Sequence, residues 1–191
     1  MTNINVGING FGRIGKCCFL QLLEDSNIII RAININNLKI ENLEQYLNND
    51  SIHGKYFYKI KILDNNFVEI NNNVIKIFRT KDVNELYWDS YDIDYLFETT
   101  GAYLTQEKAR SHRVKYICMS APPKDLSETS IYCYGVNEDK YKGENIISNA
   151  SCTTNCIAPF LKVLNKYEIV SCNFITIHSS TSSQSVVDNA N

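Results

Sequence analysis

The sequence has none of the features that mark membrane, secreted or metal-binding proteins. No apolar run reaches the roughly 20 residues that cross a bilayer, and the first five residues show no signal-peptide pattern. We therefore expect no membrane partner. The seven cysteines form neither CxxC pairs nor a Cys/His cluster, so we expect no metal ion. An odd cysteine count without a signal is typical of reduced thiols and predicts a cytoplasmic protein.

The chain is also without a strong net charge. Its 19 Lys and Arg residues nearly balance 21 Asp and Glu residues, for a net charge of −2 at pH 7, so nothing predicts a nucleic-acid-binding surface. What the sequence does contain is 191 residues, of which 44% are hydrophobic. That is enough to bury one core, and it favours one domain together with part of another.

Strand-like and helix-like segments alternate through residue 150. This alternation predicts an α/β fold with a doubly wound, Rossmann-type, mostly parallel sheet. We expect strands near residues 5–8, 28–33, 93–98, 115–119, 131–134 and 146–147, antiparallel hairpins within 56–80, and helices near 13–24, 41–47, 82–87 and 105–110. Residues 151–191 would hold a helix after Cys152 and a strand over 169–178, as the first elements of an incomplete α+β domain.

A glycine-rich turn joins the first expected strand to the first expected helix. Gly10, Gly12 and Gly15 form a GxGxxG motif. Such glycines permit a tight turn and bring the backbone close to a pyrophosphate, which binds at the helix N-terminus. In this position the motif predicts that residues 1–150 form a dinucleotide-binding domain, and the alternative is a plain glycine turn.

The second expected strand ends without the carboxylate that usually binds the ribose of a dinucleotide. Asn34, Ile35 and Asn36 occupy that place. An asparagine can hydrogen-bond the ribose diol, but without assistance from a charge. The dinucleotide interpretation therefore lacks one of its usual partners.

Cys152 is the candidate nucleophile. It opens an expected helix, where free N–H groups and the helix dipole lower the pKa of a thiol and favour the thiolate. His178 lies 26 positions further on and is the candidate base, although spacing alone supports a structural histidine equally well. Ser151, Thr153 and Thr181 carry hydroxyls that would form either a phosphate cradle or a polar cap and loop.

We interpret the other histidines and the neighbouring cysteine as structural. His53 lies in a short polar segment, and we expect His112 to be exposed. Cys156 follows Cys152 by about one helical turn, and we expect a small buried apolar residue rather than a second nucleophile.

Six segments carry motifs that occur in the same order along the whole chain. They are residues 7–15, 50–55, 98–101, 120–122, 135–137 and 148–156. Together they resemble the glyceraldehyde-3-phosphate dehydrogenase family, and the last, Ser-Asn-Ala-Ser-Cys-Thr-Thr-Asn-Cys, is highly specific to it. The resemblance implies an NAD-binding Rossmann domain over residues 1–150 and the start of the catalytic domain over 151–191.

The resemblance also implies a role for individual residues. Cys152 would be the catalytic nucleophile and His178 the base that activates it, with Ser151, Cys152, Thr153 and Thr181 binding substrate or phosphate. The cofactor-binding positions would be Asn9, Gly10, Gly12, Arg13, Ile14, Gly15, Asn34, Ile35, Lys81, Thr100, Gly101 and Ser120. Ile35 stands where the family has the ribose-binding aspartate and Lys81 where it usually has arginine, so NADP stays open beside NAD as the cofactor.

The reaction implied is the glycolytic oxidation of glyceraldehyde 3-phosphate with inorganic phosphate. A cysteine thiohemiacetal would pass hydride to NAD, and phosphate would release the thioester as an acyl phosphate. The family is homotetrameric and its members are longer, so we expect a truncated, impaired form. The alternatives are a paralogue that acts on erythrose 4-phosphate and a non-catalytic nucleotide-binding or interaction fragment.

Overall fold

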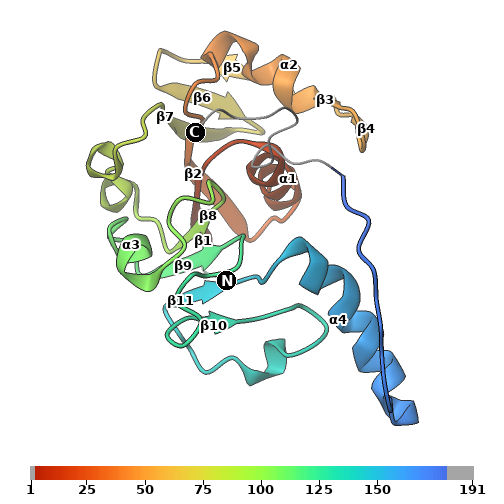
Figure 1. The fold of residues 1–191 in the computed structure, drawn as a ribbon. Coiled ribbons are helices and arrows are strands. Elements are labelled where there is room, and N and C mark those ends of the chain that lie inside the picture. Colours follow the sequence, from red (N-terminus) through yellow and green to blue (C-terminus); the bar gives the residue numbers. More distant parts are fainter. Residues whose placement is uncertain (1–2, 180–191) are drawn as a thin grey trace, which may run out of the picture.

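A nine-stranded sheet forms the centre of the computed structural model, which describes residues 3–179 (Figure 1). The strand order is β10-β11-β9-β8-β1-β2-β7-β6-β5. Parallel pairings join seven strands, which are β1 (Ile4–Asn9), β2 (Ile28–Asn34), β7 (Asn73–Phe78), β8 (Tyr95–Glu98), β9 (Tyr116–Met119), β10 (Ser130–Ile131) and β11 (Ile146–Ser148). Antiparallel pairings add β5 (Lys61–Ile62) and β6 (Phe67–Ile70) at one edge and join β3 (Asn49–Asp50) to β4 (Gly54–Lys55) in a separate ribbon.

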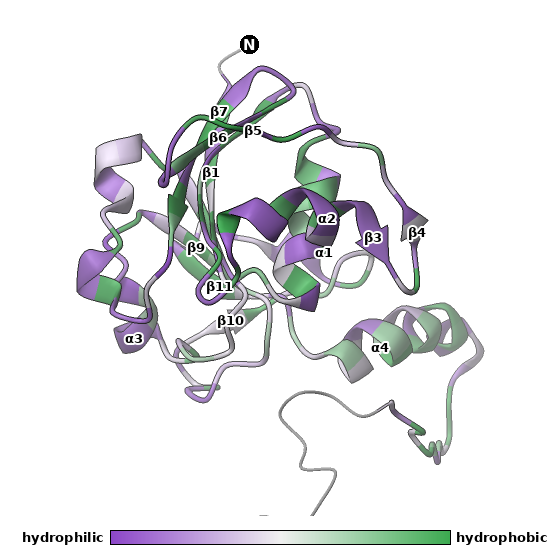
Figure 2. Ribbon diagram, turned by 90° about the horizontal axis from the view of Figure 1, so that it is seen from above, coloured by the Kyte–Doolittle hydropathy of each residue, from purple (hydrophilic) through white to green (hydrophobic). Residues whose placement is uncertain are grey.

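Three of the α-helices, α1 (Arg13–Leu22), α2 (Leu43–Asn48) and α3 (Gln106–Arg110), cover the two faces of the sheet, and α4 (Cys152–Leu164) lies beside it (Figure 2). Short 3-10 turns span Ile40–Asn42, Val83–Glu85, Trp88–Tyr91, Glu138–Lys140 and Asn165–Tyr167. Figure 2 shows α1 and α2 on one face and α3 on the other. Nowhere within residues 3–179 is a helix both long enough and apolar enough to cross a membrane.

Two apolar clusters hold these layers together. One joins the central strands to α1 and α2 through residues such as Ile33 and Phe19. The other gathers around Trp88 and contains Ala32, which precedes Ile33 in β2. Because successive strand residues point to opposite faces, β2 is buried on both sides, as the apolar run of this strand predicts. The predicted doubly wound, mostly parallel sheet is confirmed.

The chain changes direction across the sheet at β1. It passes from β1 to β2 on one side and later returns to place β8 on the other side. In open α/β sheets, ligands bind in the crevice outside the carboxyl ends of the strands at such a reversal. The GxGxxG turn follows β1 and therefore lies at this crevice.

Two of the expected strands differ from the structure. The strand predicted over 169–178 is absent, because this segment runs as irregular chain and pairs with no strand of the described residues. Its apolar side chains meet solvent, and Val170 and Ile177 are 99% and 98% exposed. The strand predicted over 131–134 ends at Ile131, because the backbone N–H of Cys133 donates to the side chain of Asn137 in a turn instead.

Candidate functional site

The glycine-rich turn needs two of its glycines for close packing. Gly10 has a φ of +95°, and a Cβ added there would lie 2.9 Å from Cγ2 of Thr100. A Cβ on Gly15 would lie only 2.1 Å from the carbonyl oxygen of Gly10, so no side chain fits where α1 meets the turn. Gly12 faces open space and caps α1 without a side-chain hydrogen bond, so the first N–H groups of the helix are available to an anion.

A cleft of about 750 Å³ opens beside this turn at the carboxyl ends of β1, β2, β7 and β8. Nine of the twelve predicted cofactor residues line it, namely Asn9, Gly10, Gly12, Arg13, Ile14, Asn34, Ile35, Lys81 and Thr100. Gly15, Gly101 and Ser120 do not line it. The cleft also has walls that no motif identified, including Tyr46 from α2 and Tyr103 after β8. Only the strand order, which is not visible locally in the sequence, brings these two tyrosines to the crevice.

The end of the cleft at Asn34 and Ile35 is built without a negative charge. Among residues 3–179, no residue that lines the cleft carries a carboxylate, whereas Arg13 and Lys81 carry positive charges. Ile35, which follows β2 where a ribose-binding carboxylate was expected, is only 4% exposed and packs into the core on the side of α1 and α2. The side chain of Asn34 is also buried, and its Nδ2 donates to Asn9 Oδ1 at 2.8 Å and to the Thr80 carbonyl at 2.9 Å. The two charged side chains named in this lining are therefore both cations, of which Arg13 is paired with Asp50.

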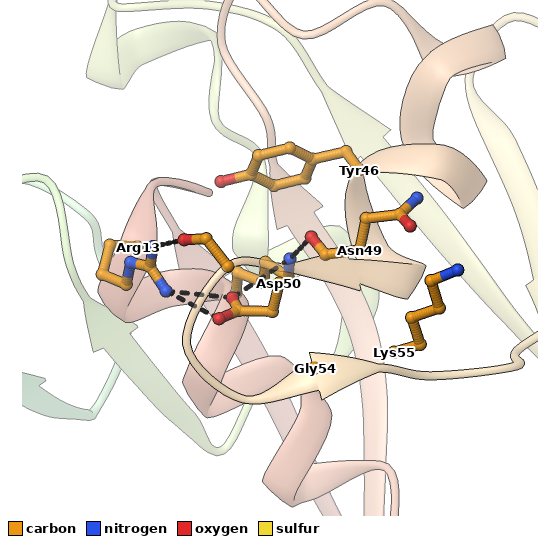
Figure 3. Close-up of a pocket in the computed structure, with 8 residues that line it drawn as sticks. Arg13, Tyr46, Asn49, Asp50, Gly54 and Lys55 are labelled. Carbon is orange, nitrogen blue, oxygen red and sulfur yellow. Dashed lines mark hydrogen bonds and ion pairs between the residues drawn. The ribbon is translucent and has the colours of Figure 1, made fainter.

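Arg13 and Tyr46 line both this cleft and a second cavity of about 770 Å³. Figure 3 shows the Arg13 guanidinium directed at Asp50, and its Nη1 donates to both carboxylate oxygens at 2.9 and 3.0 Å. The buried Lys16 ammonium lies 3.3 Å from the same carboxylate. The backbone N–H groups of His53 and Ile52, followed by these two cations, hold the pKa of Asp50 far below its ordinary range. The predicted pyrophosphate ligand Arg13 thus has a carboxylate partner within the chain.

A strained turn places Cys152 at the start of α4. Ala150 has a φ of +60°, a left-handed conformation that non-glycine residues rarely adopt, and its N–H donates to Ser148 Oγ at 3.1 Å. Ser151 then caps α4, because its Oγ accepts a hydrogen bond from the N–H of Thr154 at 2.9 Å. Asn155 ties the turn down from inside the helix by donating to the carbonyls of Asn149 and Ser151.

Cys152 and His178 are in direct contact. The Cys152 Sγ lies 3.2 Å from Nε2 of His178, and Nδ1 of the ring lies 2.7 Å from the Ser179 carbonyl. The histidine, together with the hydroxyl and N–H of Thr153, lowers the pKa of the thiol. The Ser179 carbonyl and the sulfur raise the pKa of His178. Both shifts favour a thiolate beside an imidazolium, which is the form of a reactive cysteine.

Two expectations about individual residues are wrong, and a third is not tested. Cys156 is exposed, contrary to prediction, because α4 has no buried residue. His112 is 1% exposed, also contrary to prediction, because it packs between Trp88 and Tyr103. Thr181, a predicted phosphate ligand, lies outside the described residues.

Comparisons with known proteins match both parts of the site. Residues 4–106 match the family model described as glyceraldehyde 3-phosphate dehydrogenase, NAD binding domain, and residues 151–191 match that of the C-terminal domain. The chain is 43% identical to glyceraldehyde-3-phosphate dehydrogenase of Bacteroides fragilis, over 97% of this chain and 56% of the relative. It is 41% identical to the enzyme of Buchnera aphidicola and 40% identical to glyceraldehyde-3-phosphate dehydrogenase A of Escherichia coli, covering 98% and 97% of this chain. In each case the chain spans 56% of the length of the relative.

Proposed function

Because the chain belongs to the glyceraldehyde-3-phosphate dehydrogenase family, we propose that it binds NAD and carries the nucleophile of a phosphorylating aldehyde oxidation. The observation that supports this most directly is the contact of 3.2 Å between the Cys152 sulfur and the His178 ring at the start of α4. We propose glyceraldehyde 3-phosphate and inorganic phosphate as the substrates, as the names of the relatives suggest. The seven free thiols fit a reducing compartment such as the cytoplasm.

In this proposal the cleft at the carboxyl ends of the strands holds the cofactor. The first-turn N–H groups of α1 and the Gly10–Gly12 turn would receive the pyrophosphate. Lys81 and the walls at Asn34 and Ile35 would lie along the adenosine half, while Thr100 would lie on the opposite side of the turn. Bound there, NAD would supply the acceptor for a hydride.

Cys152 would form the covalent bond to the substrate. Its thiolate attacks the aldehyde carbon, and the carbonyl oxygen takes a proton from the His178 imidazolium to give a thiohemiacetal. His178 would take this proton back as the carbon gives up a hydride to the bound cofactor, which leaves a thioester. Inorganic phosphate then attacks the thioester carbon, the carbon–sulfur bond breaks, and the products are an acyl phosphate and the free thiolate.

Hydroxyls around the start of α4 would hold the anionic groups of the substrates. Thr153 already contacts the Cys152 thiol, and Ser151 presents its hydroxyl in the same turn. Thr181 belongs to the same proposal through its position in the sequence. Erythrose 4-phosphate is the alternative substrate, because no side chain described here distinguishes the two sugars.

Nucleotide binding without turnover is the second candidate function. It is favoured by the exposure of α4 and of the chain around Ile175 and Ile177, which leaves the Cys152–His178 pair on a poorly packed part of the structure. Since misplacement of a reacting group by about 1 Å can cost 100-fold in rate, such packing matters to catalysis. The same exposed side chains predict self-association, and sedimentation equilibrium would tell a homotetramer, which the family resemblance implies, from other species.

Two measurements on the 191-residue chain test the proposal. Calorimetric titration with NAD measures binding, which Cys152→Ser should retain. Formation of NADH with glyceraldehyde 3-phosphate and phosphate measures turnover, which Cys152→Ser should abolish. Binding without turnover would favour the second candidate, and absence of binding would contradict both.

A further inference from the structure

A buried carboxylate lies beneath the floor of the cleft. Glu98 ends β8, its side chain is fully buried, and it accepts contacts on both oxygens. Oε1 receives the N–H of Thr100 at 2.8 Å together with the Thr100 hydroxyl. Oε2 receives Nδ2 of Asn9 at 2.6 Å and lies 2.9 Å from Nε2 of His112. Three hydrogen bonds and the close approach of His112 thus surround the two oxygens, and a carboxylate has no hydrogen of its own to donate.

Glu98 thereby dictates the orientation of two buried side-chain amides. Because Asn9 must donate to the carboxylate through Nδ2, its Oδ1 faces Asn34 and accepts from that Nδ2 at 2.8 Å. The remaining oxygen of Asn34 accordingly accepts from the backbone N–H groups of Asn36 and Thr80, each at 3.3 Å. A single direction of donation thus runs from the loop after β2 to the end of β8, across the strands that carry the cleft.

A second set of contacts approaches Glu98 from behind. The indole N–H of Trp88, the single tryptophan of the chain, donates to Nδ1 of His112 at 3.4 Å. With Nδ1 acting as acceptor, the ring carries its proton on Nε2, which faces Glu98. The Nε2–H meets no acceptor in ideal geometry, so this contact is close but bent. Both His112 and Trp88 are buried and lie outside the lining of the cleft.

We propose that Glu98 is a positioning residue for the dinucleotide, and that it acts by fixing the polarity of the Asn9–Asn34 amide pair and the conformation of Thr100. His112, in the tautomer that Trp88 selects, supports the carboxylate from the side away from the cleft. The inference rests on the proposed binding of NAD in this cleft. The effect is long-range, because a change at Glu98 would alter the loop at Asn36 through the side chains of Asn9 and Asn34.

Glu98→Gln changes this polarity with little change in shape. Its amide N–H₂ would face either Asn9 Nδ2 and His112 Nε2 or the Thr100 N–H, and all of these are donors. Flipping Asn9 only moves the conflict to Asn34, and flipping Asn34 moves it to the N–H groups of Thr80 and Asn36. We therefore expect NAD to bind at least about tenfold more weakly by calorimetry. Glu107→Gln, the same change on an exposed residue of α3, is the control and should bind NAD as the wild type does.

Exchanging the amide of Asn9 and the carboxylate of Glu98 should restore the hydrogen bond between these two positions. In the double variant Asn9→Asp, Glu98→Gln, the new carboxylate accepts both from the glutamine amide and from Asn34 Nδ2. We expect NAD affinity to recover by about threefold or more over Glu98→Gln, but not fully, because His112 loses its partner. A role confined to stability would leave the NAD affinity of the folded variants unchanged, so it would produce neither this loss nor this recovery. The rate of Cys152 alkylation should stay the same throughout, because that site lies on α4.

A measurement on the wild-type protein tests the same series of hydrogen bonds. Long-range ¹H–¹⁵N correlation spectra at neutral pH should show His112 with its proton on Nε2 and one protected indole N–H from Trp88. A proton on Nδ1, or unchanged NAD affinity in Glu98→Gln, would overturn the inference while leaving NAD binding intact. If Glu98→Gln does not fold, the double variant decides, and failure of that variant to bind NAD would also overturn the inference. A wild-type chain that binds no NAD would instead refute the proposed function itself.

Discussion

Replacing Ile35 with aspartate should tighten NAD binding and lower the stability of the fold at the same time. The position follows β2 at the end of the cleft that we propose to hold the ribose, where the described lining contains no carboxylate. A carboxylate there could accept two charge-assisted hydrogen bonds from a ribose diol, which contribute roughly 1.5–3 kcal/mol and correspond to about ten- to a hundredfold in affinity. It would also repel the 2′-phosphate of NADP, so the preference for NAD over NADP should rise.

The stability cost follows from where Ile35 lies. Its side chain is 4% exposed and belongs to the core cluster under α1 and α2, so its removal loses roughly 1.5–3 kcal/mol of hydrophobic stabilisation. An aspartate must also turn toward the cleft, since a charge left in the core would be strongly unfavourable. We expect the free energy of unfolding to fall by about 2–4 kcal/mol in the absence of cofactor.

Ile35→Asn separates the two effects, because it loses the same apolar contacts but gains no charge. Calorimetric titration with NAD and with NADP, at a temperature where all variants are folded, gives the affinities, and thermal unfolding gives the stabilities. Both variants should be destabilised, whereas only Ile35→Asp should bind NAD more tightly. An equal gain in both variants, or no gain in a folded aspartate variant, would refute the assignment of this end of the cleft to the ribose.

Three further predictions concern the thiol, the turn and the ion pair. Peptide mapping after brief iodoacetamide treatment at neutral pH should find Cys152 alkylated fastest of the seven thiols. His178→Asn should slow the alkylation of Cys152 at neutral pH but not at high pH, because the variant removes the contact that lowers the thiol pKa. Equal alkylation rates in the wild type and the variant would contradict the pairing. Gly15→Ala should destabilise the fold by about 1–3 kcal/mol in thermal unfolding, since its Cβ would meet a backbone carbonyl, whereas Gly12→Ala should stay within about 0.5 kcal/mol. The folded-state pKa of Asp50 lies below its unfolded value, so the stability that this carboxylate contributes is present above about pH 4 and is lost as the pH falls further. Asp50→Asn should therefore flatten the acid dependence of the free energy of unfolding, measured by unfolding curves at a series of pH values.

The parallel sheet could be predicted because its strands are short apolar runs bounded by polar turns. β1 and β2 follow this pattern, and tertiary packing agrees with it on both faces. In the segment 169–178 apolar and polar residues also alternate as in a strand, but no strand of the described residues lies beside it. Such a pattern shows that the side chains suit a strand and does not show that a hydrogen-bonded partner exists. Local sequence therefore predicted which segments could be strands, and only pairing determined which became strands.

The candidate site divides in the same way. The GxGxxG turn and the capped start of α4 are local, so their residues could be identified from spacing. Glu98 and His112 could not, because their burial depends on contacts with Asn9 and Trp88, which lie 89 and 24 positions away. A polar segment at the end of α3 favours exposure unless such distant partners are known. Non-local hydrogen bonds are thus where sequence interpretation of this fold was weakest.

Because α4 has no buried residue, it should unfold independently of the rest of the described chain. The sheet and its helices share two buried clusters and should open only by global unfolding, whereas a helix of 13 residues with no buried side chain is close to the length at which isolated helices are marginal. Amide protons of α4 should therefore exchange with solvent long before those of β1 and β2. On warming, the reactivity of the Cys152 thiol should decline gradually while the cleft is still folded. The thiol and the cleft would therefore lose their structure at different temperatures within one chain.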